Sequence, residues 1–592
     1  MKRNIGRTRL YPCWSLAACL GAWICWISPA LAQVNGSGPS PSSSFDNVLN
    51  LPGDEAVITG NPFESIGGVP EQTTQLNVSD DGVVGRVFAA LSGSEVNISG
   101  GSVGDDFRTF PGSEVNISRG FVGEGFRAFS GSEVNISGGS VGDGFDALLG
   151  SDVELIGGEF RLNGANFDGG SITSSDGDVF TGTLADGSAF IFSELSTDVL
   201  VDVTLTTVSL PPLDTNPIVV DAPVVGGPSG LRPGQELTVV TGGSLGENFA
   251  VVDAILNVDA GTVGIGLEAS GSVVNINGGS VKDFFQAFSG SEVNISGGSV
   301  GERFVADNGI VNINGGAVDR FFRANGSEVN ISGGFVDSFS ANSGSEVNIS
   351  GGSVGFFDAN SGSEVNISGG SVGRGFDANS GSIVNINGGA VGIQFIARSD
   401  SEVNISGGSV GHSFGAGSGS EVNISGGSLG HSFGAGSGSE VNISGGSVGR
   451  GFDVYSGSDV ELIGGEFRLN GANFDGGSIS LSDGDVFTGT LADGSAFVFR
   501  HIIRLYSDSD TLVDVTLTPA SLPPLDTTPI VVDAPIVGGP SGLRPGQQLT
   551  VVTDGSLGDN FAVVDAILNV DAGTVENGLE ASGSVVNISG GL

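Results

Sequence analysis

The chain has 592 residues, of which 104 are glycine, and its formal net charge is −45 at pH 7. A chain this acidic repels nucleic acid and anionic membrane surfaces, so both are excluded as partners. Hydrophobic residues make up 38% of the chain and glycine follows no three-residue period, which argues against disorder and against a collagen triple helix.

Residues 1–32 have the pattern of a secretory signal peptide. Four basic residues precede an apolar run, and Ala30-Leu31-Ala32 forms a small-residue cleavage site. We therefore expect a secreted or cell-surface protein with no membrane span in the mature chain. An alternative is a lipoprotein signal that places a lipid on Cys19. Cleavage before Gln33 removes all three cysteines, so we expect no disulfides, and it changes the formal charge to −49.

Residues 33–74 begin with a stretch rich in Ser, Pro and Gly and are predicted to be a linker followed by an N-terminal cap. Repeats of 18–19 residues then fill 75–162, 237–469 and 549–592. Their consensus is S-G-S-E-V-N-I-S-G-G-S-V-G-x-x-F-x-A, and the Asn of V-N-I marks each turn. Asn77 marks a plausible first turn. Val239, 18 residues before Asn257, is taken as the marker of another.

The alternation within one repeat predicts a strand. Val96 and Ile98 point to one side, and Asn97 to the other. Gly-Gly forms a corner, and a Phe recurs about ten residues after the marker Asn. One repeat cannot bury its apolar side alone, whereas stacked repeats can. The sequence therefore predicts an all-β fold, a parallel β-solenoid in which Val, Ile and Phe form inward ladders.

Two copies of a Pro-containing β module interrupt the repeats. They are predicted at 163–236 and 470–548, and the 23-residue string at 150–172 recurs unchanged at 457–479. Period-2 alternation and Asp-Gly-Asp turns indicate β-hairpins or long loops that leave the solenoid.

The outward Glu of each repeat is a candidate metal ligand. Stacked carboxylates about 4.8 Å apart repel one another, and Ca²⁺ would relieve that repulsion. The alternative, which we favour, is a solvated acidic face that keeps the chain soluble by its charge. The candidate ladder residues are Glu402, Glu421, Glu440 and Asp459.

Three further features are weaker candidates. Asp176 and Asp178 lie in an Asp-Gly-Asp turn that could hold Ca²⁺, although such residues are usually plain turn residues. His412 and His431 occupy equivalent places in adjacent repeats, and two histidines alone are a weak metal signal. No catalytic residue is predicted, because no single turn collects convergent ionisable groups.

The V-N-I-S-G-G-S-V-G repeats, over most of 75–162 and 239–463, resemble secreted bacterial right-handed parallel β-helix proteins. The resemblance is to the pectate-lyase-like superfamily in its adhesin-type members. It implies a structural or adhesive role at the cell surface or in the extracellular matrix, without catalysis. Partners would be extracellular polysaccharide or cell-surface components. The alternatives are a polysaccharide-binding or polysaccharide-cleaving β-helix, and a calcium-dependent β-roll-like module. Separately from the resemblance, the sequence ends at Leu592 just after a new V-N-I-S-G-G, so we expect either a truncated sequence or end-to-end self-association.

Overall fold

The computed structural model describes residues 45–51, 57–58, 65–66, 68, 73–168, 170–193, 197–224, 230–342, 344–475, 477–502, 509–535, 542–576 and 578–590. The expected signal peptide at 1–32, the alternative lipid site at Cys19 and most of the expected linker and cap lie outside these residues. Among the described residues, no helix is long and apolar enough to cross a membrane.

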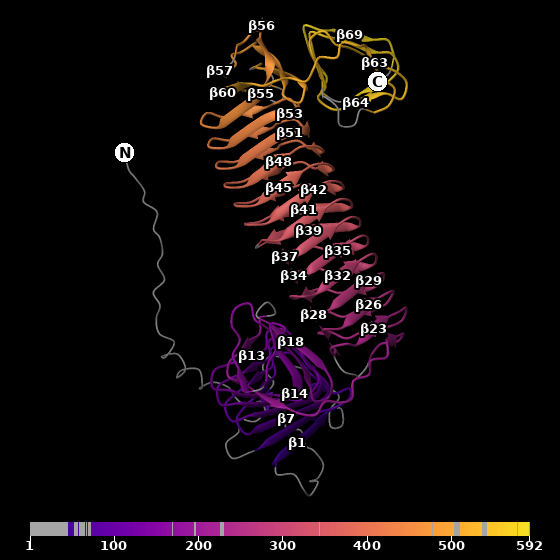
Figure 1. The fold of residues 1–592 in the computed structure, drawn as a ribbon. Coiled ribbons are helices and arrows are strands. Elements are labelled where there is room, and N and C mark those ends of the chain that lie inside the picture. The colour runs from indigo at the N-terminus through magenta and orange to yellow at the C-terminus, as the bar shows by residue number, and fades with distance from the viewer. Residues whose placement is uncertain are drawn as a thin grey trace, which may run out of the picture. The chain divides into compact units, whose positions relative to one another are not determined.

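The chain folds as a parallel β-solenoid of about 26 turns, with about 52% of its residues in strands, and the described part contains no helix. Figure 1 shows successive turns stacked as parallel strands, and this confirms the predicted fold class. The 19-residue spacing of the sequence becomes the strand register, because Asn404 pairs with Asn423 and Asn423 with Asn442.

Three segments, each with its own apolar core, make up the described chain. The first contains β1 (Asn47–Leu51) to β20 (Val203–Thr207), the second β21 (Ile218–Val220) to β60 (Val515–Pro519), and the third β61 (Ile530–Val532) to β69 (Val585–Ile588).

One strand of each turn carries the V-N-I sequence or the residues in the equivalent register. In the first segment these strands are β1, β4 (Thr74–Val78), β7 (Ser94–Val103), β9 (Glu114–Val122), β11 (Glu133–Ile136) and β14 (Asp152–Leu162). In the second they are β23 (Glu236–Val239), β26 (Ile255–Val258), β29 (Val273–Ile276), β32 (Glu292–Ile295), β35 (Ile310–Ile313), β38 (Glu328–Ile331), β40 (Glu346–Ile349), β42 (Glu364–Ile367), β45 (Ile383–Ile386), β48 (Glu402–Ile405), β51 (Glu421–Leu429), β53 (Glu440–Val448) and β55 (Asp459–Leu469).

The Phe ladder lies inside the solenoid, as predicted. Phe304 and Phe376 are fully buried, and neighbouring rings stack with centroids 4.5–5.0 Å apart from Phe285 to Phe452. The structure adds Phe285 and Phe322, which follow a second Phe in their repeats and also lie in the ladder. Because each ring contacts the rings above and below it, the ladder forms one continuous apolar core.

The second Gly of each Gly-Gly corner adopts a conformation that other residues rarely adopt. Gly352 has φ +67°, and a Cβ there would lie 2.5 Å from the carbonyl oxygen of Gly333 in the previous turn. The close approach of successive corners therefore requires glycine.

The expectation for Val239 was wrong by one residue. Thr238 pairs with Asn257, while Val239 pairs with Val258 and is fully buried. The spacing is therefore 19 residues rather than 18. A one-residue slip would have turned the apolar Val239 outward and Thr238 into the core, so burial sets the register.

Each module closes one stack with a hairpin. In the first module, β17 (Val179–Leu184) and β18 (Ala189–Ser193) pair antiparallel, and β17 pairs with the end of β14. β20 then returns as a final parallel rung beside β14. The second module repeats this arrangement with β58 (Val486–Leu491), β59 (Ala496–Arg500) and β60. The hairpin covers the apolar end of the stack, which would otherwise be an open sheet edge.

Candidate functional site

The outward face of the long strands carries a continuous ladder of asparagine amides. The Asn423 side chain donates to Asn404 at 3.1 Å, and the Asn442 side chain donates to Asn423 at 3.0 Å. Each amide has a second hydrogen available, and those of Asn404 and Asn423 also donate to the Glu two residues earlier. The ladder therefore joins successive turns through side chains as well as through the backbone.

The predicted Glu ladder exists in the register expected for it. Glu402 pairs with Glu421, Glu421 with Glu440, and Glu440 with Asp459. Glu402 accepts from Asn404 at 2.8 Å and Glu421 from Asn423 at 3.0 Å, so one oxygen of each is already hydrogen-bonded. Calcium binding by these carboxylates stays a prediction.

The Asp-Gly-Asp turn holds its second carboxylate within the protein. Asp178 accepts from the Asn163 side chain at 2.8 Å and from the backbone N–H of Ser175 at 2.9 Å, while Asp176 is exposed. These bonds fix the turn that leads into β17, a structural role that Asp178 has whether or not a cation binds.

The two histidines stack on adjacent turns. The ring centroids of His412 and His431 are 5.0 Å apart, and Nδ1 of His412 accepts from the backbone N–H of His431 at 3.0 Å. Across the described residues, no group of three or more His, Cys, Asp or Glu side chains is placed to hold a metal ion.

The first module hairpin has two buried faces with different roles. Phe190 and Phe192 pack into the core of the first segment, where the ring centroids of Phe192 and Phe145 are 5.4 Å apart. On the other face, Val179, Ala189 and Ile191 pack against Ala250, Val252 and Phe288 of the second segment. The hairpin therefore caps one stack and docks the next; we call this contact the first joint.

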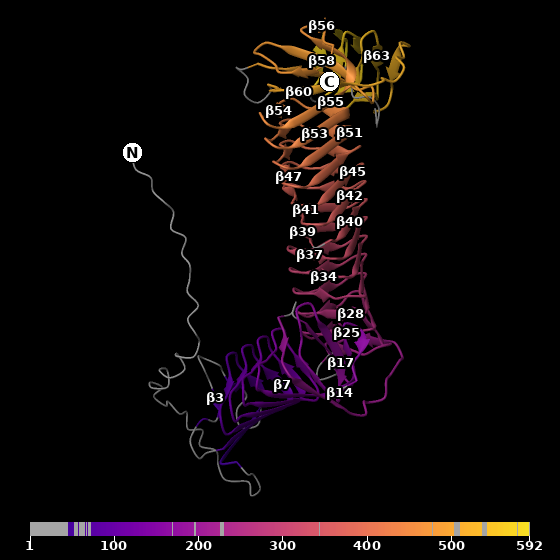
Figure 2. The same ribbon diagram turned by 60° about the vertical axis from the view of Figure 1, so that its left-hand side comes forward.

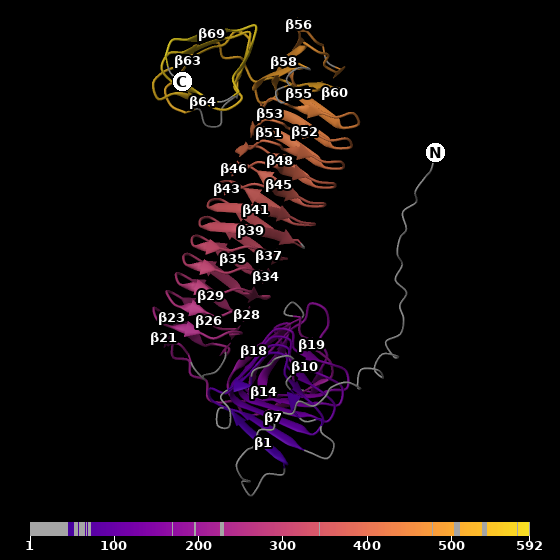
Figure 3. The same ribbon diagram turned by 180° about the vertical axis from the view of Figure 1, so that it is seen from behind.

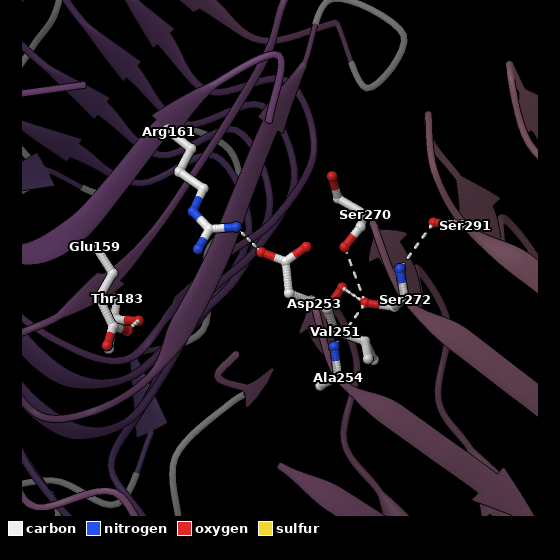
Figure 4. Close-up of polar contacts among 9 residues, drawn as sticks. All are labelled: Glu159, Arg161, Thr183, Val251, Asp253, Ala254, Ser270, Ser272 and Ser291. Atoms are coloured by element: carbon white, nitrogen blue, oxygen red, sulfur yellow. Dashed lines mark hydrogen bonds and ion pairs between the residues drawn. The ribbon is translucent and has the colours of Figure 1, made fainter. Parts of the chain in front are cut away.

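Polar contacts surround the apolar centre of the first joint. Arg161 forms an ion pair with Asp253, as Figure 4 shows. Arg232, whose side chain is 7% exposed, pairs with Glu159 at 3.1 Å and donates to the Pro211 carbonyl at 2.8 Å. Gly230 allows the close approach, since a Cβ there would lie 3.0 Å from that of Ala189.

A second joint repeats this design between the second and third segments. Ala496 and Val498 pack against Ala562 and Val564, and the two parts lie together in Figure 3. The polar contacts recur in the pairs Arg468–Asp565 and Arg544–Glu466. The second joint has two polar contacts that the first lacks. Arg450 stands in place of Asp143 and pairs with Glu580 at 2.9 Å, and Arg500 stands in place of Ser193 and donates to the Ala581 carbonyl at 2.7 Å. The long sequence duplication is therefore a duplicated joint.

A groove of about 800 Å³ lies beside the first joint and is lined by both segments. Its carboxyl groups belong to Asp105, Asp106, Glu124, Asp143 and Asp146. Its guanidinium groups belong to Arg86, Arg127, Arg303 and Arg323. Two ion pairs form among the lining residues, Arg86–Asp105 and Arg127–Asp146, each at 2.9 Å. These groups come from turns far apart in sequence, which is why reading single repeats missed them.

Burial perturbs the acids in and behind this groove. Burial, and then the charge of Glu124, raise the pKa of Asp143 to about 7, against a hydrogen bond from Gln286. Burial likewise raises the pKa of Glu124, with Asp105 adding to the effect. Asp198 is buried and accepts from the backbone N–H groups of Phe145 and Ser193, and burial raises its pKa well above the usual value.

The pKa of Asp143 predicts a pH-dependent first joint. Because the folded pKa lies above the unfolded value of about 3.9, its contribution to stability is greatest below pH 4 and is lost as the pH rises through 7. The wild-type melting temperature should therefore fall between pH 5 and pH 8. Asp143→Asn should weaken this fall, whereas Asp176→Asn, at an exposed site, should leave it unchanged. Calorimetry across this range at low salt measures it, and equal slopes in all three proteins would contradict it.

The comparisons with known proteins add little to the site. No family model and no curated protein matches the chain. Three chains of solved structures match. One is a crystal structure of a hyper-glycosylated fragment of TibA, residues 55–350, whose modification is catalysed by TibC. It is 14% identical and covers 70% of this chain and 96% of the fragment, with a TM-score of 0.19. At that score the likeness carries no argument, and the fold assignment rests on the register and core described above.

Proposed function

We propose that the chain is a secreted structural or adhesive protein of the cell surface or extracellular matrix, and that it acts without catalysis. The observation that carries this proposal is the unbroken ladder of outward Asn side chains from Asn257 to Asn442, each donating to its neighbour one turn earlier. A surface that repeats the same groups at fixed spacing suits many weak contacts with an extended partner.

The joints support the same proposal. Each joint buries apolar side chains of the module hairpin against the next stack and adds ion pairs around them. An isolated flexible linker would leave the segments free to rotate, whereas a packed interface holds them together. A scaffold that must present its surface in a fixed arrangement needs contacts of this kind. Calcium binding and end-to-end self-association remain additions to the proposal that rest on the sequence alone.

The test is retention on surfaces. The full chain, secreted from a bacterial host and coupled to beads, should be retained under flow on surfaces coated with extracellular polysaccharide or cell-surface material. We expect at least tenfold more retained beads than with an acidic globular protein of similar charge. Equal retention on every surface would contradict an adhesive role.

A second candidate function is cleavage of a polysaccharide in the groove. The observation that favours it is the pair Asp143 and Glu124, in which burial raises the pKa of both carboxyls. A carboxyl that stays protonated near neutral pH beside a second carboxylate is the arrangement that glycoside hydrolysis needs. Release of reducing ends from the glycans retained in the bead assay, abolished by Asp143→Asn, would favour this candidate over the first.

A further inference from the structure

A column of non-repeating side chains runs along the outside of the second segment. It consists of the residues directly before five successive phenylalanines of the core ladder. We call it the outer column: Phe284, Arg303, Phe321, Ser338 and Phe356. Figure 2 shows the strands that follow it or contain it, β34 (Val305–Asp307), β37 (Phe322–Asn325), β39 (Phe335–Asn342) and β41 (Ser353–Ala359), in order along this edge.

Three of the five residues of the outer column have a positive backbone φ. Phe284, Arg303 and Phe321 have φ of 63°, 62° and 64°, a region that bulky residues rarely adopt. At the same place, other turns carry Val87, Gln394, Ser413 or Ser432 with φ of 60° to 64°. Their core rings stack equally well, since the Phe414 and Phe433 centroids are 4.9 Å apart. The positive φ therefore belongs to the repeat, and the fold does not require large side chains here.

Two of the three phenylalanines of the outer column are largely exposed to solvent, and Phe284 is half-buried. Phe321 is 52% exposed and Phe356 is 58% exposed. The Arg303 guanidinium lies 4.9 Å from the Phe284 ring centroid. The three phenyl groups occupy alternate turns, so each is two rungs from the next, with rungs about 4.8 Å apart. The result is a ladder in which phenyl groups alternate with a guanidinium and a hydroxyl.

Two adjoining hollows with polar linings lie beside this ladder. Phe284, Arg303 and Phe321 line the groove beside the first joint, where carboxyl and guanidinium groups are nearly balanced in number. A second hollow of about 430 Å³ follows, lined by Gln286, Val305, Arg323, Asn325, Ser340 and Asn342. Paired charges and amides offer hydrogen-bond donors and acceptors to a polyhydroxyl ligand, whereas the acidity of the chain opposes a polyanion.

We propose that the outer column binds a neutral β-1,4-linked polysaccharide laid along the stack. Alternate sugar rings pack on Phe321 and Phe356, because an extended chain of this linkage turns the same face toward the protein at every second ring, and the Phe284 ring holds the Arg303 guanidinium beside them. The intervening sugars bond through their hydroxyls to Arg303 and Ser338. The inference deepens the proposed adhesive role by naming a ligand class and its site.

The experiment compares variants that copy residues found elsewhere in the same register. The double variant combines Phe321→Ser and Phe356→Ser. Serine already occupies the same place in other turns, as Ser413 and Ser338, so the fold tolerates both changes. Phe335→Ser is the matched control, because Phe335 is 45% exposed, lies outside the column and pairs in register with Ser353. Calorimetric titration of the full chain with cellohexaose and chitohexaose measures binding. Polygalacturonate and an α-linked glucan serve as comparison ligands, and sedimentation of each protein measures self-association.

We expect the wild type and Phe335→Ser to bind a neutral β-1,4 hexasaccharide equally, and the double variant to bind it at least tenfold more weakly. No wild-type binding, equal loss in the control, or preference for polygalacturonate would overturn the inference. Self-association that disappears only in the double variant would also overturn it, since the column would then contact a second copy of the chain. If beads carrying the double variant are retained as well as wild type, this inference fails while the adhesive role stands. Absence of retention on every surface refutes the adhesive role itself.

Discussion

Phe357→Ala should destabilise the second segment by about 3–5 kcal/mol, the largest effect we expect from a single core change. Phe357 is fully buried, and its ring centroid lies 5.0 Å from those of both Phe339 and Phe376. Removing the ring interrupts the ladder and leaves a cavity between two turns that cannot close without shortening the stack. In a solenoid each turn is supported only by its neighbours, so the defect weakens turns on both sides.

Denaturant unfolding monitored by circular dichroism measures this effect. The neighbouring residue supplies the control, because Phe356 is exposed and Phe356→Ser should change stability by less than about 0.5 kcal/mol. Phe357→Leu keeps much of the side-chain volume, so it should lower the free energy of unfolding by roughly half as much as Phe357→Ala. Equal effects of Phe356→Ser and Phe357→Ala would show that the ladder is not the core of the segment.

The repeating part of the fold was predictable because its sequence is locally consistent. Val and Ile alternate with Asn and Glu, Gly-Gly marks the corner, and each Phe falls nine or ten residues after the marker, so strand period, register and inward face agree. Prediction failed where a repeat departs from the consensus. Val239 lies in Leu237-Thr238-Val239, which has no Asn marker, and the register there was misplaced by one residue.

The candidate site was much less predictable than the fold. The Glu ladder and the adjacent places of His412 and His431 follow from the repeat and were predicted from the sequence. The groove and the joints were not, because their partners are far apart in sequence, as with Arg161 and Asp253 or Asp143 and Gln286. Two signals in the sequence could have indicated them. The first is duplication of the arginine and acid positions at both joints, and the second is the double Phe at 284–285 and 321–322, where the outer residue breaks the repeat.

Arg232→Met should uncouple the first and second segments. We expect the free energy that holds the joint together to fall by about 2–3 kcal/mol. Arg232 is almost fully buried, contacts Glu159 through two nitrogens and satisfies the Pro211 carbonyl. Removing one partner of a buried ion pair costs about 3–5 kcal/mol, and the partial exposure of Glu159 reduces that cost because water can solvate the remaining carboxylate.

Uncoupling predicts a change in cooperativity as well as in stability. In wild type the packed joint couples the unfolding of the two segments, so both should unfold in a single calorimetric transition. In Arg232→Met the first segment should melt separately, and proteases should cut the Pro-rich connection at 208–217 faster than in wild type. Arg544→Met should produce the same behaviour at the second joint, because Arg544 repeats the contacts with Glu466 and the Pro523 carbonyl.

A surface ion pair provides the matched control for this change. Arg398 pairs with Asp377 at 2.7 Å, but half of its side chain is exposed, so Arg398→Met should cost less than about 1 kcal/mol and leave the transition single. A double-mutant cycle with Glu159→Gln then isolates the coupling between Glu159 and Arg232 from the loss of the Pro211 contact. If Arg232→Met and Arg398→Met behave alike, the apolar contact of the hairpin alone holds the two segments together, and the buried ion pair of Arg232 with Glu159 adds nothing measurable to the joint.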